Sequence, residues 1–186
     1  IFTKGRLTVS VTCEDEGRKL AGCELEKFLP KLYADSERGA DAVISPAKKN
    51  EGFMDASQVQ YVARAGNFRS HGFEYHGALR ILKVIMEYDY LWINVRVKGG
   101  AYGCMNGYMR NGDTYFVSYR DPNLEKTNEI YDQIPAYIET FDADDRDMTK
   151  YIIGTVSDMD TPMNPNTKGD RSMAAYLQGI TIQQLQ

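Results

Sequence analysis

The segment Asn94-Val95-Arg96-Val97-Lys98-Gly99-Gly100-Ala101-Tyr102-Gly103 decides how this chain is organised. It joins the end of a predicted helix to the start of a predicted β-hairpin, and three of its last five residues are glycines. Glycine adopts positive φ angles without strain, so the chain can leave the helix in a sharp turn here. An arginine, Arg96, precedes the glycine pair, and a tyrosine, Tyr102, follows it.

An amphipathic helix is predicted before this turn, from about Gly77 to Val95. Its apolar residues recur at three- and four-residue steps and therefore share one face. They are Ala78, Ile81, Leu82, Ile85, Trp92 and Val95. A sheet or a second helix is needed to cover that face.

Strands are predicted on both sides of this helix. Residues 58–64 alternate, with Val59, Tyr61 and Ala63 on one face. Two further strands, residues 103–110 and 114–119, flank Asn111-Gly112, which is a strong signal for a tight hairpin turn.

Helices are predicted after the hairpin at residues 123–140, 148–156 and 172–178. The first follows Asp121-Pro122, which suggests an N-cap aspartate and a proline in the first turn. The second follows the acidic entry Asp142–Asp147. This order predicts an α+β fold, a mostly antiparallel sheet with helices packed on one face.

The two ends of the chain suggest a piece of a longer protein. Residues 1–35 contain an alternating strand pattern, Leu7–Thr12, and a helix from about Glu16 to Tyr33, and we interpret them as the closing strand and helix of a preceding domain. Residues 36–52 are mostly charged or small, and we predict that they form a linker. We interpret residues 53–186 as a C-terminal domain that is truncated at its end. Thr181 and Gln184 form a capping box at the start of one more helix.

Composition excludes several classes of protein. The net charge of the 186 residues is -4, which argues against a nucleic-acid surface. No apolar run approaches the roughly 18 to 20 residues of a membrane span, so no membrane partner is expected. The three cysteines are an odd number without CxxC spacing, which favours a reducing compartment.

Local motifs provide no complete catalytic set. A phosphate loop follows a strand and precedes a helix, whereas this glycine segment follows a helix and precedes a strand. Its local sequence is therefore explained most simply by a structural turn. His71 and His76 are five residues apart, which separates them on a helix or a strand, so we expect no metal site there. Asp142–Asp147 lacks the glycine of a calcium loop, and capping carboxylates explain it better.

Three strings resemble the C-terminal region of presequence proteases, a branch of the pitrilysin/insulinase superfamily of zinc metallopeptidases. They are residues 58–66 (QVQYVARAG), residues 96–103 (RVKGGAYG) and residues 115–123 (YFVSYRDPN). The resemblance implies a pitrilysin-like domain and a peptide-degrading zinc endopeptidase. It assigns Arg96 and Tyr102 to substrate binding and to stabilising the tetrahedral intermediate, with Gly99 and Gly100 allowing a peptide to approach the backbone.

The same resemblance implies what this chain lacks. The zinc motif H-x-x-E-H occurs nowhere in the sequence, so zinc is expected on a missing N-terminal half of the parent chain, and this fragment is expected to be inactive alone. The expected partners are that half and a peptide substrate. The alternative is a non-catalytic binding or assembly subunit of the superfamily. The expected location is the cytoplasm of a bacterium, or an organelle matrix in a eukaryote.

Overall fold

The computed structural model describes residues 3–34 and 47–185. The chain divides into two compact units, one of residues 52–161 and one that combines residues 1–51 with residues 162–186. The predicted linker, residues 36–52, lies mostly outside the described part, and the assignment of residues 1–35 to a preceding domain stays a prediction.

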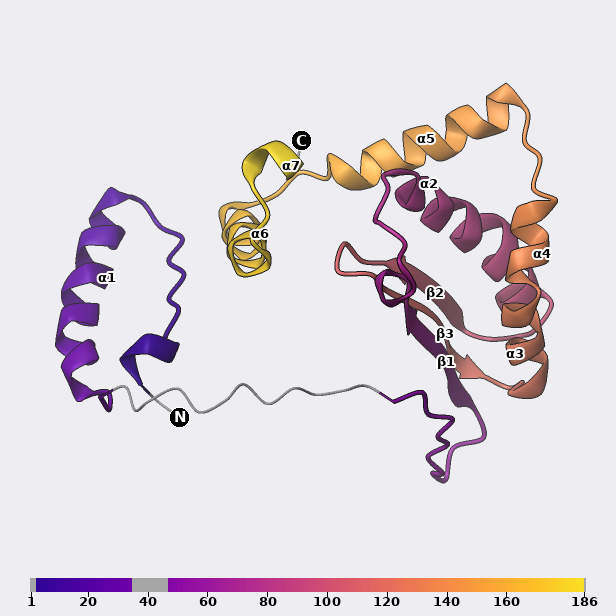
Figure 1. The fold of residues 1–186 in the computed structure, drawn as a ribbon, viewed down its shortest axis with the longest axis horizontal. Helices are drawn as coiled ribbons and strands as arrows, with labels where there is room; N and C mark the ends of the chain where they lie inside the picture. Colours follow the sequence, from indigo (N-terminus) through magenta and orange to yellow (C-terminus); the bar gives the residue numbers. More distant parts are fainter. Residues whose placement is uncertain (1–2, 35–46, 186) are drawn as a thin grey trace. The chain divides into compact units, whose positions relative to one another are not determined.

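A three-stranded antiparallel sheet forms the centre of the unit of residues 52–161 (Figure 1). Its strands are β1 (Gln60–Asn67), β2 (Gly103–Tyr108) and β3 (Asp113–Asp121), in the order β1-β3-β2. The hairpin predicted at Asn111-Gly112 is confirmed, and Gly112 has the positive φ of +96° that such a turn requires.

One long helix crosses the sheet, and it changes type half-way. It begins as α2 (Ala78–Ile85) and continues as a π-helix, η4 (Met86–Val97), in which each N–H bonds to the fifth preceding carbonyl. The amide of Lys98 closes this pattern by donating to the carbonyl of Ile93 at 2.9 Å. The helix predicted from Gly77 to Val95 is therefore confirmed in extent but not in periodicity.

The wider turn changes which residues face the sheet. Met86, Leu91 and Val95 are fully buried, at steps of five and four residues. Trp92 was predicted to lie on the buried face and is 42% exposed, so that prediction is wrong. The α-helical step of 3.6 residues would place Trp92 inward, but the π-helix rotates it to the outside and turns Leu91 inward.

Helices α3 (Glu125–Asp132) and α4 (Ile134–Glu139) replace the single helix predicted at residues 123–140. The break lies at Gln133, because Pro135 has no N–H to donate within a continuous helix. The N-cap predicted at Asp121 is also wrong: this residue ends β3, and α3 begins only at Glu125, with Leu124 as its N-cap.

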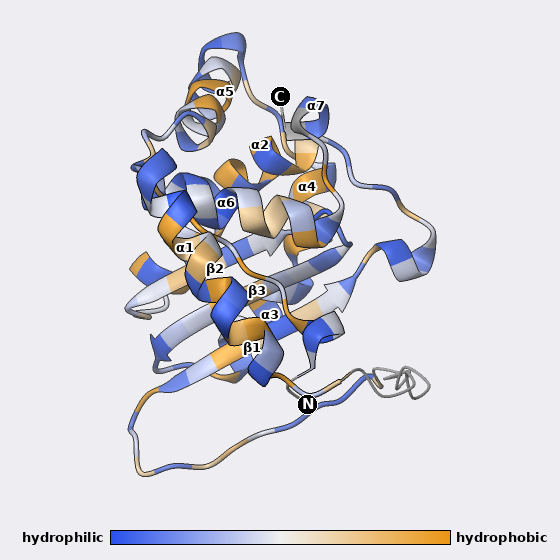
Figure 2. Cartoon of the chain, turned by 90° about the vertical axis from the view of Figure 1, so that its left-hand side faces the viewer, coloured by the Kyte–Doolittle hydropathy of each residue, from blue (hydrophilic) through white to orange (hydrophobic). Residues whose placement is uncertain are grey.

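The core lies between the sheet and the helices on one of its faces, as the sequence predicted (Figure 1). The hydroxyl of Tyr131 on α3 reaches across to donate to the carbonyl of Val62 on β1 at 3.3 Å. The buried cluster consists of Val62, Met86, Tyr90, Leu91, Val95, Ala101, Cys104, Tyr131 and Ile134. Figure 2 shows hydrophobic and hydrophilic residues interspersed along the helices and strands.

Helix α5 (Asp145–Met159) completes the same unit. Its N-cap is Asp144, whose carboxylate accepts from the amide of Asp147 at 2.8 Å, which confirms the predicted acidic helix entry. Tyr151 on α5 donates to the carboxylate of Asp89 on η4 and fixes the helix to the neighbouring layer.

The second unit contains α1 (Asp15–Phe28), α6 (Pro165–Gln178) and α7 (Ile182–Leu185), with short 3₁₀ turns at Lys4–Arg6 and Leu29–Lys31. A further 3₁₀ turn, Arg69–His71, belongs to the first unit. One half of the capping box predicted at the C-terminal end is present, since Gln184 Oε1 accepts from the amide of Thr181 at 2.9 Å. The amide of Gln184 donates to the carbonyl of Thr181 at 3.1 Å and not to its hydroxyl. Among the helices of the described residues, none is both long and apolar enough to cross a membrane.

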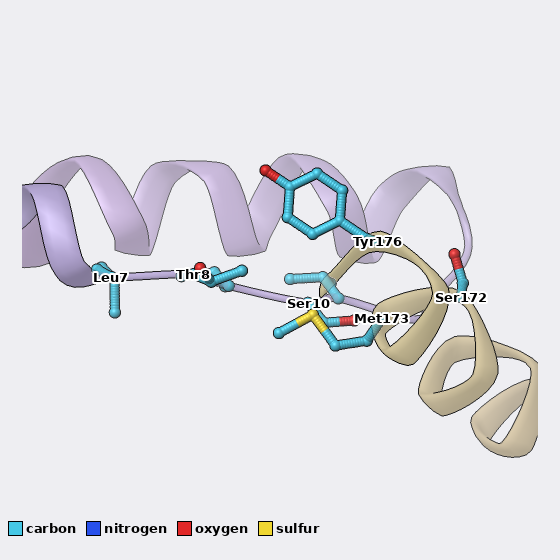
Figure 3. A pocket seen from close by; sticks show the side chains of 8 residues that line it. Leu7, Thr8, Ser10, Ser172, Met173 and Tyr176 are labelled. Carbon is cyan, nitrogen blue, oxygen red and sulfur yellow. The ribbon is translucent and has the colours of Figure 1, made fainter. Parts of the chain in front are cut away.

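The strand predicted at Leu7–Thr12 is wrong for this structure. The segment is extended, but it is exposed and belongs to no ladder among the described residues. Alternation makes a segment suitable for a sheet, yet a strand forms only beside a partner. Instead the segment and α6 line a hollow of about 470 Å³ (Figure 3). Its lining residues are Leu7, Thr8, Val9, Ser10, Val11, Ser172, Met173 and Tyr176.

Candidate functional site

The glycine turn after η4 brings Arg96 and Tyr102 together. The amide of Gly100 donates to the carbonyl of Arg96 at 2.9 Å, and that of Ala101 donates to the carbonyl of Val95 at 3.2 Å. Gly100 has a φ of +82°. A side chain at Gly99 would lie 2.4 Å from the carbonyl oxygen of Val95. The two glycines are therefore required for different reasons, one for its φ angle and one for space.

Arg96 is held on both sides by its neighbours. Its Nε donates to the carbonyl of Tyr102 at 3.1 Å, which ties together the two ends of the turn. Its guanidinium carbon lies 4.0 Å from the centre of the Trp92 ring, a cation–π contact across one turn of the helix. Stacking through the face leaves the in-plane N–H donors of a guanidinium directed to its sides.

The segment Ser118–Asn123 supports this turn from β3. The side-chain amide of Asn123 donates to the carbonyl of Gly99, and the amide of Tyr102 donates to the carbonyl of Arg120 at 3.3 Å. Gly103 pairs with Tyr119 in the β2–β3 ladder, and a side chain at Gly103 would push into the Tyr119 ring, 2.2 Å away. The two strings 96–103 and 115–123, distant in sequence, therefore interlock in one place.

Aromatic rings continue from the turn across the sheet. Tyr102, 61% exposed, meets the ring of Tyr119 edge-on with 5.3 Å between ring centres. Tyr119 in turn stacks on the exposed ring of Tyr61 at 6.4 Å. The guanidinium of Arg120 lies 5.5 Å from the centre of the Tyr102 ring. The surface beside the turn therefore combines three tyrosines with two arginines, Arg96 and Arg120.

A buried carboxylate lies beneath this surface. Asp121 is fully buried, and its Oδ2 accepts from the hydroxyls of Ser118 and Thr127, the latter at 2.7 Å. Its Oδ1 accepts from the amide of Asn123 at 2.8 Å. The bond to the Asn123 amide holds the residue whose side chain donates to the carbonyl of Gly99. The network therefore connects the buried side of β3 to the turn.

Two other buried groups lie nearby, the thiol of Cys104 and the phenol of Tyr131. Burial raises the pKa of the Cys104 thiol to about 11, with a further increase from the charge of Glu87 and an opposing effect of Arg96. Burial likewise raises the pKa of Tyr131 to about 12. These groups therefore belong to the core, and neither is poised for acid–base chemistry near neutral pH.

All four residues predicted for the site, Arg96, Gly99, Gly100 and Tyr102, lie in one turn, and their roles stay predictions. The sequence reading did not identify Trp92, Tyr119 and Arg120 as parts of the same surface. A signal existed for this end of β3, because counting back from Asn111-Gly112 as a two-residue turn pairs Gly103 with Arg120, one residue beyond its actual partner Tyr119. The exposure of Arg120 and of Trp92 had no such signal, since it depends on a bulge and on a π-helix.

The zinc implied by the resemblance does not fit the residues described here. In residues 3–34 and 47–185, no three His, Cys, Asp or Glu side chains gather closely enough to hold a metal ion. His76 uses its Nδ1 locally, accepting from the amide of Ala78 at 3.1 Å. No step of a reaction is therefore assigned to a metal on this chain.

Comparison with known proteins identifies a matching family model and several relatives. The family model described as PreP C-terminal domain matches residues 50–186. The protein HypA of Clostridium perfringens is 42% identical over the whole chain, which covers 19% of that protein. Presequence protease 1, chloroplastic/mitochondrial, of Arabidopsis thaliana is 38% identical over 74% of the chain and 13% of its own length. The mitochondrial presequence protease of Drosophila melanogaster is 26% identical over 91% of the chain and 17% of its own length.

The chain thus spans less than a fifth of the length of these relatives. The match covers both interlocked strings and the elements that carry them, β1 to α6. The chain belongs to the PreP C-terminal domain family.

Proposed function

We propose that this chain supplies the substrate-contact surface of a peptidase, with Arg96 and Tyr102 facing a zinc ion held by another part of a longer protein. Its substrates are unfolded peptides, the class to which presequences belong. The full protein hydrolyses them, and the 186 residues alone do not. A bacterial form acts in the cytoplasm and a eukaryotic one in an organelle matrix.

The observation that carries this proposal is the hydrogen bond from Arg96 Nε to the carbonyl of Tyr102. A structural turn needs glycines, but it does not need an arginine side chain bonded to the main chain of a tyrosine across it. The bond holds the Arg96 guanidinium at the residue that carries the largely exposed phenol, which pre-organises a contact surface.

The two side chains suit separate roles. A guanidinium offers a rigid set of N–H donors that match the carbonyl oxygens of an extended peptide. A phenol hydroxyl donates one hydrogen bond to an oxygen on which negative charge develops. Arg96 therefore holds the peptide backbone, and Tyr102 stabilises the tetrahedral intermediate.

The test is peptide cleavage by the longer protein carrying Tyr102→Phe or Arg96→Ala. Loss of one oxyanion donor typically costs about 10²–10³ in turnover, so Tyr102→Phe should lower kcat by that order with little change in KM. Arg96→Ala should raise KM as well as lower kcat, because it removes binding present in the ground state.

A matched control is the pair Arg110 and Tyr75, in which a guanidinium lies 5.3 Å from a tyrosine ring away from the turn. Arg110→Gln and Tyr75→Phe should leave kcat and KM unchanged. Turnover within about twofold of wild type for both Tyr102→Phe and Arg96→Ala would refute the proposed roles.

A further inference from the structure

Strand β3 contains one residue more than β1 at the level of the glycine turn. Gln60 pairs with Asp121 and Val62 with Ser118, so the single residue Tyr61 lies opposite both Tyr119 and Arg120. This is a β-bulge, and in one common form the residue with a left-handed conformation is a glycine. Here that residue is Arg120, with a φ of +47°.

The bulge changes the direction of the side chains that follow it. In a regular strand, residues three apart point to opposite faces. Ser118 and Asp121 are three apart, yet both are buried on the helix side, where the hydroxyl of Ser118 donates to the carboxylate of Asp121. The extra residue therefore returns Asp121 to the core and leaves Tyr119 and Arg120 on the surface around Tyr102.

The identity of the bulge residue works against stability. Arg120 is the only residue other than glycine with a positive φ in the described part of the chain. A side chain in the left-handed region is strained, and strained backbone in native proteins gathers at functional sites. The Arg120 side chain is exposed and fills no core position, so packing does not explain why an arginine is used.

We propose that Arg120 is a positioning residue for Tyr102, an inference that rests on the proposed function. Its carbonyl accepts from the amide of Tyr102 at 3.3 Å, while its guanidinium lies 5.5 Å from the centre of the Tyr102 ring. Together with the edge-on contact to Tyr119, these interactions set the direction of the Tyr102 hydroxyl. A cation over the ring also draws electron density from the phenol and makes its hydroxyl a better donor.

The first test separates stability from activity in the longer protein. Arg120→Gly should leave Tm unchanged or raise it, because glycine accepts the positive φ. It should lower kcat about two- to fivefold, the size expected from losing an exposed cation–π contact. KM should stay within about twofold, since the bulge and the peptide-binding Arg96 remain. Arg120→Lys keeps a cation and should recover most of kcat, whereas Arg110→Gln should change nothing.

Two further results decide the assignment. In the Tyr102→Phe background, Arg120→Gly should cause no further loss, because it acts through the missing hydroxyl. In the 186-residue chain, Arg120→Gly should shift the ring-proton NMR signals of Tyr102, and Arg110→Gln should not. Unshifted Tyr102 signals, an equal loss of kcat in both backgrounds, or a lowered Tm would each overturn the inference. Normal turnover of Tyr102→Phe would instead refute the proposed function, and the NMR result would still test the positioning.

Discussion

Replacing Asp121 by asparagine tests whether a buried charge holds the two interlocked strings together. The carboxylate is fully buried and accepts three hydrogen bonds, from Ser118, Asn123 and Thr127. All three donors come from within six residues of Asp121, and Asn123 continues the network to Gly99. A change at this carboxylate should therefore be felt at the turn.

The expected size follows from the three bonds. A hydrogen bond to a charged acceptor contributes about 1.5–3 kcal/mol and a neutral one about 0.5–1.5 kcal/mol. The asparagine oxygen can still accept from the two hydroxyls, more weakly, but its NH₂ group faces the amide of Asn123, donor against donor. Part of the loss is offset because no charge is buried any longer. The net cost of Asp121→Asn should be about 2 kcal/mol, and that of Asp121→Ala about 4 kcal/mol, because alanine leaves two buried hydroxyls without an acceptor.

The assay is urea unfolding of the 186-residue chain followed by fluorescence. Trp92 is the only tryptophan in the sequence and lies in the same compact unit as Asp121, so its signal reports this unit. The control is Asp113→Asn at the exposed start of β3, where the expected loss is below about 1 kcal/mol. Equal midpoints for wild type and Asp121→Asn would refute the reasoning, since the charge would then contribute nothing to the network.

Two other changes test the helix and the buried thiol. Leu91→Ala should lower the free energy of unfolding by about 2–5 kcal/mol, because the π-helix buries Leu91. Trp92→Ala should lower it by about 1 kcal/mol or less, because Trp92 is partly exposed. The reverse order in urea unfolding would contradict the observed periodicity. At pH 8, a thiol reagent should label the exposed Cys13 and Cys23 but label Cys104 only after unfolding, because burial raises the pKa of Cys104 to about 11. Because the pKa of Cys104 is higher in the folded state, that state holds the thiol proton more tightly than the unfolded state does. The free energy of unfolding should therefore fall as pH rises from 9 towards 11, and Cys104→Ala should make this fall smaller.

The hairpin and its turn could be predicted from sequence because their signals are local. Asn111-Gly112 requires a turn, and the strands on either side then pair by counting residues. The glycines after the helix were equally informative, since Gly100 does adopt the positive φ that such a segment suggests. The local sequence alone therefore predicts that Arg96 and Tyr102 lie on either side of one turn.

The π-helix could not be predicted in this way. Residues Met86 to Val97 are rich in apolar and aromatic types, so steps of three or four and steps of four or five both find apolar residues. Periodicity decides between helix types only when one face is polar. Which of Leu91 and Trp92 is buried was therefore settled by packing against the sheet, not by the local pattern.

The β-bulge and the burial of Asp121 could not be predicted from sequence either, because both depend on pairing between distant segments. Asp121-Pro122 has the local appearance of a helix start, and its use as the end of a strand depends on partners in β1 and α3. The bulge depends on the pairing of β1 with β3, which joins residues more than fifty positions apart. Signals of this kind are absent from any single segment, so the contribution of Arg120 to the surface became visible only in three dimensions.

Exposure and strain divide the residues of the two strings into two groups. Gly99 has no room for a side chain, Gly103 lies under the Tyr119 ring, and Asn123 bonds the turn, so each is needed for the chain to fold this way. Tyr102 and Arg120 are different, because one is largely exposed and the other is exposed and strained. Folding does not require their side chains, which fits the contact and positioning roles proposed for them. Stability and turnover should therefore respond to different residues of the two strings, stability to Gly99, Gly103 and Asn123, and turnover to Tyr102 and Arg120.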